Sequence, residues 1–435
     1  MTPFFLALQN INHFLWSGPL LLLLMGTHLY FTMKLHFPQK NIIKAIRLSI
    51  APDKKNNGSN LSPFATLATT LAATLGTGNI IGVSTAAALG GPGAVFWCWI
   101  TGILGMATAY GECFLSVLFR SKGPDGLYKG GPMYVWENAL HKKSVGKLYA
   151  ILTLMAAFGA GCTTQSNSIT QTTAGLGISP HIVGFLAALT AGLVIVGGIR
   201  AIGNVCVKIV PFLAILYTAS CLVLLFLNRD ALLPAIRLIV THALAPRAVL
   251  GGAAGSSLML TARYGIARGL FTNEAGIGTA AIAAAATESP DPQKQAYVSM
   301  TAVFWDTVVM CLLSGLVIVT NMLKRPASLI GVNEAGLTGA AFSLFPGLGN
   351  TFLSVCLIAF AITTLIGWSY LGERAMEYLS GQKGIFIFKV AYIVMIYIGA
   401  VMPLNLVWEC SDLVNAMMVL PNVAALFLLQ KHLRS

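Results

Sequence analysis

Charged residues are scarce in this chain of 435 residues: they make up 9% of it, whereas an average soluble domain carries about 25%. Acidic residues are the scarcer sign, with 14 Asp and Glu against 27 Lys and Arg. So few charges cannot cover the surface of a water-soluble globule of this length, which excludes that class. Intrinsic disorder is excluded as well, because disordered chains combine low hydrophobicity with high charge, and 56% of these residues are hydrophobic.

Cysteine and histidine patterns that hold metals or form disulfide frameworks are also missing from the sequence. The eight cysteines all fall in apolar stretches and form no CxxC or CxxxC pair, so we interpret them as small buried apolar side chains. The seven histidines are scattered, mostly near the ends of apolar stretches, and no convergent nucleophile–base or metal-ligand set accompanies them. The sequence therefore predicts neither an enzyme nor a bound cofactor.

What the chain has instead is a series of long apolar stretches. A membrane-spanning helix needs about 20 mostly apolar residues, and eleven stretches qualify. We therefore predict an all-α polytopic membrane protein with about eleven transmembrane helices. They cover residues 11–34, 63–89, 94–119, 148–174, 181–199, 205–227, 250–286, 296–320, 340–371, 385–402 and 404–429.

The basic residues indicate how these helices are oriented. With the N-terminus outside, alternation of the helices puts the basic loops around residues 34–55 and 120–147 on the cytoplasmic side. Lys and Arg are enriched in cytoplasmic loops, so the formal net charge of +13 is an orientation signal and does not require a nucleic-acid partner. We predict a protein of the bacterial-type cytoplasmic (inner) membrane, with its N-terminus outside and its C-terminus in the cytoplasm.

Two of the apolar stretches are interrupted by glycine and polar residues. The second contains the run 76–82, of sequence GTGNIIG, and the seventh contains the glycine-rich run 269–278. Each opens a set of five stretches, so one helix is followed by two five-helix repeats of opposite orientation. Matching interruptions indicate the binding site of a secondary transporter, because broken helices expose backbone N–H and C=O groups at mid-membrane. Close helix packing through the GxxxG of Gly78 and Gly82 is the alternative explanation of the first run.

Polar side chains at membrane depth are costly and are therefore candidate functional groups. Asp306 lies deep in its stretch and is either part of a cation site or the structural partner of an embedded arginine. Glu274 is a candidate structural partner of Arg268. The polar run 161–171 is expected to face a wet cavity in part. The threonine pair 363–364 offers hard oxygen ligands for an alkali cation, unless its hydroxyl groups only bond back to their own helix.

Taken together, these residues resemble the alanine/glycine:cation symporter family, also called the sodium:alanine symporters. The motifs occur in the expected order along nearly the whole chain, at 73–82, 89–97, 105–108, 130–134, 268–278, 306–307 and 367–374. The resemblance implies the leucine-transporter type of fold, with two inverted five-helix repeats and an additional helix. The corresponding boundaries are 1–61 for the N-terminal transmembrane helix and basic cytoplasmic loop, 62–228 for the first repeat, 229–249 for an amphipathic outer connection, and 250–435 for the second, inverted repeat.

The resemblance also implies a binding site at the break of the second stretch. N–H groups of the half-helix that starts there would attract the carboxylate of an amino acid. The bulky Phe271 and Trp368 would leave room for only a hydrogen or a methyl group, which selects glycine and alanine. The implied substrate-binding residues are Gly76, Thr77, Gly78, Asn79, Gln165, Phe271, Thr364 and Trp368. A sodium site would use the carbonyl groups of Ala72 and Leu75 and the hydroxyl groups of Thr363 and Thr364.

We therefore expect a secondary active transporter that imports a small neutral amino acid, alanine or glycine, together with sodium by alternating access. A proton-coupled transporter of the same architecture is the first alternative, with Asp306 or Glu112 as the proton carrier. A non-transporting membrane receptor is the second, and the lack of a soluble signalling domain in the sequence argues against it. The expected partners are the amino acid, sodium and the lipid bilayer, without nucleic acid.

Overall fold

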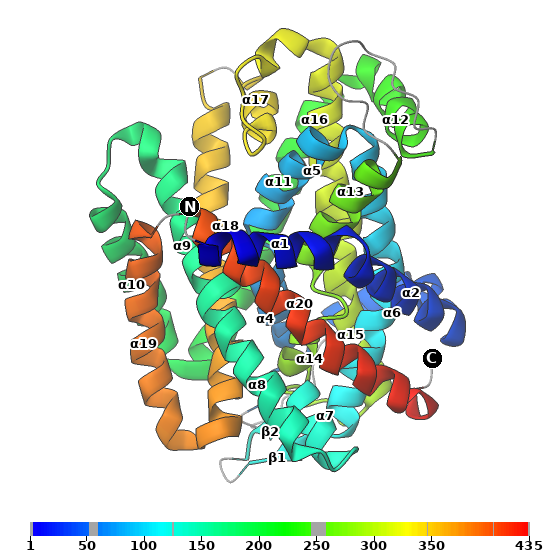
Figure 1. The fold of residues 1–435 in the computed structure, drawn as a ribbon, viewed down its shortest axis with the longest axis vertical. Helices are drawn as coiled ribbons and strands as arrows, with labels where there is room; N and C mark the ends of the chain where they lie inside the picture. Colours follow the sequence, from blue (N-terminus) through cyan, green and yellow to red (C-terminus); the bar gives the residue numbers. More distant parts are fainter. Residues whose placement is uncertain are drawn as a thin grey trace.

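The computed structural model describes residues 3–51, 60–123, 126–244, 258–345, 347–402 and 404–433, and these are almost entirely helical (Figure 1). The predicted all-α class is confirmed, apart from one antiparallel hairpin of β1 (Ser121–Lys122) and β2 (Tyr128–Lys129). Parts of the basic loop, the outer connection and the seventh stretch (52–59, 245–249 and 250–257) lie outside the described residues.

The helices of the first half are α1 (Pro3–Ser17), α2 (Pro19–Lys34), α3 (Ile42–Ile50), α4 (Pro63–Thr74), α5 (Ile81–Gly90), α6 (Gly93–Leu118), α7 (Pro132–Asn138), α8 (Lys143–Phe158), α9 (Thr164–Thr173), α10 (Pro180–Val196), α11 (Gly198–Leu227) and α12 (Arg229–Leu244). Those of the second half are α13 (Leu258–Asn273), α14 (Thr279–Ala284), α15 (Pro292–Val303), α16 (Leu312–Lys324), α17 (Leu337–Phe342), α18 (Gly349–Ser380), α19 (Gln382–Val401) and α20 (Leu404–Leu428). π-helical turns join α8 to α9 (Gly159–Thr163) and α15 to α16 (Phe304–Cys311).

Most of the predicted stretches are long helices. Within the described residues, eight helices are long and apolar enough to cross a membrane, or nine if the bent pair of α4 and α5 counts as one span. This confirms a multi-span protein, although the number is below eleven. Two predicted stretches account for the difference. The 17 residues of α10 extend only about 26 Å, less than the hydrocarbon core, and α13 is described only from Leu258 onward.

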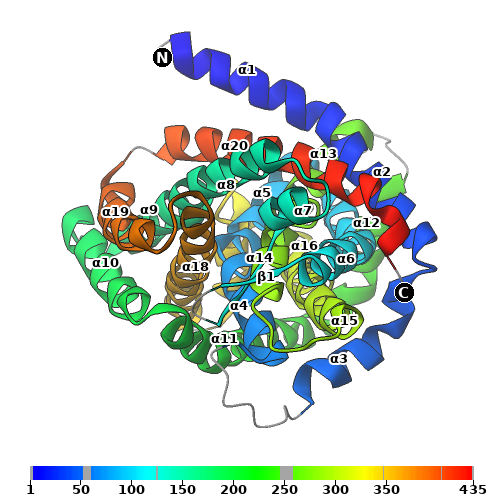
Figure 2. The ribbon, with the colours of Figure 1, turned by 90° about the horizontal axis from the view of Figure 1, so that it is seen from below.

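The interrupted stretches lie at the centre of the bundle, as the view from below shows for α4, α5 and α14 (Figure 2). Every residue of α14 is buried, and so is every residue of α4 except Phe64. Helices such as α10, α11 and α19 lie at the periphery and expose large apolar side chains, as lipid-facing helices do. The central position means that any group exposed at a break is enclosed by protein.

The first interruption is a real break in a helix. The span bends by 60° between α4 and the short 3-10 turn Thr77–Asn79 that precedes α5. Gly76 is extended there (φ −131°, ψ −150°), so its N–H leaves the helical ladder and donates to Oδ1 of Asn79 at 3.2 Å. The break falls where glycine and polar residues interrupt the apolar pattern, which confirms its predicted position.

The second interruption separates α13 from α14. Three of its residues have positive φ: Glu274 (54°), Gly276 (93°) and Gly278 (94°). Only glycine adopts such angles without cost. At Gly278 space is limiting as well, because an added Cβ would lie 2.6 Å from Oδ1 of Asn422. The run 269–278 thus leaves helical geometry between α13 and α14 inside a tightly packed centre.

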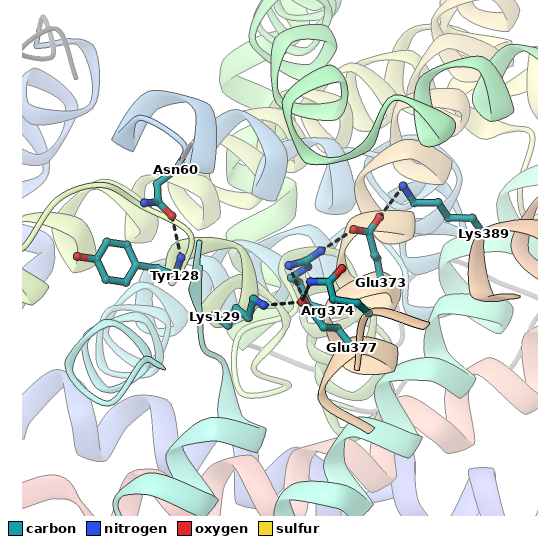
Figure 3. Close-up of polar contacts among 8 residues, drawn as sticks. Asn60, Tyr128, Lys129, Glu373, Arg374, Glu377 and Lys389 are labelled. Atoms are coloured by element: carbon teal, nitrogen blue, oxygen red, sulfur yellow. Dashed lines mark hydrogen bonds and ion pairs between the residues drawn. The ribbon is translucent and has the colours of Figure 1, made fainter. Parts of the chain in front are cut away.

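At the end of the bundle that carries the hairpin, buried charged side chains form a network between elements (Figure 3). Lys129 of β2 contacts Glu377 of α18 at 2.5 Å, and Arg374 bridges Glu377 and Glu373 at 2.5 Å each. Lys389 of α19 approaches Glu373 at 3.3 Å. The network therefore ties the hairpin to α18 and α19.

Candidate functional site

The break between α4 and α5 is held open by side chains from other helices. Asn79, whose Oδ1 accepts the N–H of Gly76, donates through Nδ2 to Oδ1 of Asp306 at 2.8 Å and to the Asp306 carbonyl at 3.1 Å. Thr307 donates to the other carboxylate oxygen of Asp306 at 2.6 Å. Asp306, which is fully buried, therefore positions the break through Asn79, and its carboxylate accepts hydrogen bonds from an amide and a hydroxyl group.

The glycines of the first run also allow close packing. A Cβ on Gly78 would lie 2.9 Å from Oγ1 of Thr272 in α13, and one on Gly82 would lie 3.8 Å from the same atom. Close packing through the GxxxG therefore applies to the contact with α13. The same run of residues also contains the break, so the two explanations do not exclude each other.

A small cavity of about 20 Å³ lies against the break, enough for about one water molecule. Five of the predicted substrate-binding residues line it: Gly76, Gly78, Gln165, Phe271 and Trp368. Gln165 is fixed by a bond from its Nε2 to the Ala160 carbonyl at 3.1 Å. These five residues come from the break between α4 and α5 and from α9, α13 and α18, so the fold gathers them from both halves of the chain.

The other three predicted residues lie next to the cavity without lining it. Thr77 donates from Oγ1 to Oε1 of Gln165 at 3.4 Å. Asn79 is turned toward Asp306, as described above. Thr364 donates to the carbonyl of Leu75 at 3.3 Å, and a Cβ on Gly76 would lie 2.9 Å from its Oγ1.

Several lining residues were not predicted, among them Glu274, Thr272 and Asn415. Glu274 accepts from the hydroxyl of Thr279 at 2.5 Å. Oδ1 of Asn415 is buried without a hydrogen-bond partner, so it is available to a bound ligand. The sequence contained one signal for Glu274, a carboxylate inside an interrupted apolar stretch. Asn415 lies in a predicted plain span and gave none.

The predicted sodium ligands lie where α18 approaches the end of α4. The packing is close, since a Cβ on Gly367 would lie 2.6 Å from the backbone N of Ala73. The last carbonyl groups of a helix have no partner within the helix. The carbonyl of Leu75 accepts a hydrogen bond from the hydroxyl of Thr364 in another helix, α18. The hydroxyl of Thr363 instead donates to the Phe360 carbonyl of its own helix at 2.8 Å. The hydroxyl of Thr363 therefore bonds back to its own helix, whereas the hydroxyl of Thr364 bonds to another helix.

The second break has its own polar support. Oε1 of Glu112 in α6 accepts the N–H of Gly276 at 2.8 Å and Nδ2 of Asn422 at 2.5 Å. Oε2 of Glu112 is buried without a hydrogen-bond partner. Glu112 and Asp306, the two candidate proton carriers, are thus each tied to one of the two breaks.

A wider cavity of about 420 Å³ lies next to the small one. Its lining includes charged residues of both signs, Arg263, Arg268, Glu409 and Asp412. Phe271 lines both cavities and is the residue they share. Phe271 therefore lies between the wide cavity and the small cavity at the break in α4–α5.

A helical multi-span protein with a discontinuous helix at its centre has the architecture of a secondary transporter. The chain belongs to the sodium:alanine symporter family, whose sequence profile matches residues 3–435. The family resemblance is thereby confirmed, and so is the prediction that the chain is not an enzyme, because the family consists of symporters. Membership also makes it a multi-pass membrane transporter.

Similar proteins extend this result. The sodium/alanine symporter AgcS of Methanococcus maripaludis is 41% identical over 434 residues, which cover 98% of this chain and 95% of that protein. The probable sodium/glutamine symporter GlnT of Bacillus subtilis is 34% identical over 427 residues, covering 97% and 87%. Among solved structures, a Na⁺-coupled sialic acid symporter in a substrate-bound outward-open state has a similar fold, with a TM-score of 0.55 and 13% identity over 87% of this chain and 81% of that one.

Proposed function

We propose that this protein imports a small neutral amino acid, alanine or glycine, together with sodium by alternating access. One observation carries the proposal: a central helix is broken beside a small cavity that Phe271 and Trp368 line. The cavity holds about one water molecule and must widen to admit a substrate, and the two rings restrict that substrate to a very short side chain. The similarity to a symporter named for sodium and alanine supports this choice.

In this proposal the carboxylate of the substrate lies against the backbone at Gly76, Thr77 and Gly78 and is bound by the N–H groups of Thr77 and Gly78, because the N–H of Gly76 donates to Asn79. Asn79 holds this segment in place through its bond with the N–H of Gly76. The side-chain amide of Gln165 supplies a further polar contact. Phe271 and Trp368 bound the side-chain end of the substrate, and Thr364 lies between the substrate and the cation.

Sodium is a co-substrate that binds the carbonyl oxygens of Ala72 and Leu75 and the hydroxyl oxygens of Thr363 and Thr364. These are the hard oxygen ligands that an alkali cation needs. The support is the contact of Thr364 with the Leu75 carbonyl across two helices. A cation bound there would fix α18 against the broken helix and favour the conformation that also binds the substrate, which is the coupling that symport requires.

The proposed architecture is one helix followed by two inverted five-helix repeats, divided as 1–61, 62–228, 229–249 and 250–435. The N-terminus is outside and the C-terminus cytoplasmic, in a bacterial-type inner membrane. Matching breaks in α4–α5 and α13–α14 support the repeat. The hairpin end, which carries Lys122, Lys129 and Arg120, is then the cytoplasmic face.

The decisive experiment is uptake of radiolabelled alanine into proteoliposomes under an imposed sodium gradient, an imposed proton gradient or neither. We expect accumulation with the sodium gradient only. Accumulation with a proton gradient in sodium-free buffer would replace our proposal with the proton-coupled one, which the buried Asp306 and Glu112 at the two breaks support. No accumulation of alanine or glycine under any gradient would reject both.

Replacing Trp368 by Phe is expected to widen substrate selection. The smaller ring enlarges the cavity beside the substrate, so uptake of valine relative to alanine should rise about tenfold, the effect of one or two methylene groups in an apolar pocket. The measurement is competition by valine in the alanine uptake assay. Trp136→Phe is the control, because Trp136 is also buried but donates to the Pro421 carbonyl away from the cavity. An unchanged valine-to-alanine ratio in Trp368→Phe would contradict its role.

A further inference from the structure

A pocket of about 370 Å³ lies at the hairpin end of the bundle, where α10 meets α11 and α18 meets α19. It is separate from the two cavities described above and shares no lining residue with them. Its lining includes Arg200, Glu373, Arg374 and Lys389. The pocket therefore adjoins the ion-pair network drawn in Figure 3.

The charge balance of this pocket is positive. Three cationic side chains line it, those of Arg200, Arg374 and Lys389, against the single carboxylate of Glu373. The network continues behind the pocket with one further charge of each sign, Lys129 and Glu377, which leaves the balance unchanged. Nε of Arg374 is buried without a hydrogen-bond partner. Among the described residues, the site thus carries more cationic than anionic side chains.

Two helices point their N-termini into the same pocket. Gly198, the first residue of α11, and Gln382, the first residue of α19, both line it. Neither helix has a side-chain cap at this end. N–H groups in the first turn of a helix have no partner within the helix and can bind an anion, although the C-terminus of α10, whose C-cap Gly197 also lines the pocket, contributes partial negative charge.

An apolar groove continues from the pocket along α10 and α19. It measures about 540 Å³, and among its lining residues are Leu193, Val196, Ile393 and Tyr397. Val196 directly precedes Gly197 of the pocket, and Ile393 lies about one helical turn beyond Lys389. Its apolar lining faces outward, with Leu193 and Val196 more than 70% exposed. The anion-binding pocket and the groove therefore form one continuous surface.

We propose that this surface binds an anionic phospholipid of the leaflet on the hairpin side. The phosphate lies between Arg200, Lys389 and the N-termini of α11 and α19, and one acyl chain lies in the groove between α10 and α19. A basic pocket between membrane helices is a known way to hold anionic lipid head groups. The groove decides between lipid and a soluble phosphate, because a soluble phosphate has no chain to fill it.

The test is native mass spectrometry of the full-length protein in a neutral detergent, titrated with phosphatidylglycerol or phosphatidylcholine. We expect phosphatidylglycerol to bind and phosphatidylcholine to bind much more weakly. Arg200→Gln and Lys389→Gln should each weaken phosphatidylglycerol binding about fivefold, and the double variant about 25-fold, from the usual contribution of one basic residue near a membrane surface. The single Arg200→Gln change leaves the Lys389–Glu373 pair intact.

Lys383→Gln is the matched control, because Lys383 is an exposed lysine in the first turn of α19 that does not line the pocket. It should bind phosphatidylglycerol within about twofold of the natural protein. Equal loss in this control, or full binding by the double variant, would overturn the proposal. Displacement of the lipid by glycerol 3-phosphate at the same concentration would assign the pocket to a soluble phosphate and also overturn it. The readout is binding, so it does not depend on which amino acid is transported.

Discussion

Replacing Gly161 by Ala is expected to reduce alanine uptake about 5- to 150-fold. Gly161 lies in the π-helical turn between α8 and α9, and a Cβ at this position would lie 2.3 Å from Cγ of Trp368. Trp368 is buried and lines the small cavity, so its ring must move toward the proposed substrate. An overpacked contact costs about 1–3 kcal/mol, and here the displacement occurs where the substrate has the least room. The measurement is initial uptake in proteoliposomes, normalised to folded protein.

Two further variants make this prediction specific. Gly175→Ala is the control, since Gly175 follows α9 and an added Cβ there meets nothing within 4 Å; its uptake should be unchanged. The double variant Gly161→Ala/Trp368→Gly removes the Trp368 atoms that the new methyl group would meet, Cβ, Cγ and Cδ2, and should therefore take up alanine better than Gly161→Ala alone, as expected of residues in contact. A double variant as inactive as Gly161→Ala alone would show that the methyl group acts by some path other than Trp368.

The positions of the breaks were predictable because the signal is local. Glycine and polar residues replace leucine within a few positions at 76–82, and no other part of the chain is needed to notice it. The same holds for Gln165, which stands in a polar run inside an apolar stretch. The structure adds the cause: the N–H of Gly76 leaves the helix for Oδ1 of Asn79. That bond joins residues only three positions apart, so it too depends on the local sequence.

Contacts between distant segments could not be predicted in the same way. Thr363 and Thr364 are neighbours on α18 and point in directions about 100° apart, so only the packing against α4 decides which hydroxyl reaches Leu75. Glu274 could be recognised as a buried carboxylate, but its bond with Thr279 depends on the non-helical backbone at positive φ between the two residues. The pairing of Lys129 with Glu377 joins the hairpin to α18, and nothing in either local sequence indicates it.

The number of spans shows a different limit. Apolar length identifies a stretch as a candidate span but does not fix its ends. The helix α10 stops at Val196 because the chain turns at Gly197 and at Gly198, which has a φ of 72°. The stretch predicted at 181–199 therefore loses its last residues to the turn, and the helix falls below the usual length of a span.

Replacing Thr364 by Val is expected to raise the sodium concentration for half-maximal uptake about 10- to 100-fold. Valine keeps the shape of threonine and removes only the hydroxyl group, which donates to the Leu75 carbonyl at 3.3 Å. The proposed cation would lie against these two oxygens, and a contact between a polar group and a charge in a buried site contributes about 1.5–3 kcal/mol. The measurement is alanine uptake at increasing sodium concentration with constant ionic strength.

The effect should belong to the hydroxyl group and to this position. Thr364→Ser retains the oxygen and should restore sodium affinity to within a few-fold. Ser369→Ala removes another buried hydroxyl of α18, one that donates only to the Ile366 carbonyl of its own helix at 2.7 Å, and should leave the sodium dependence unchanged. If Thr364→Val instead raised the alanine KM at saturating sodium and left sodium affinity intact, Thr364 would be a substrate contact only. If Thr364→Val had the same sodium dependence as the natural protein, the cation would not bind at the end of α4. An ion coordinated by the Leu75 carbonyl there would bind more weakly once the neighbouring hydroxyl oxygen was lost.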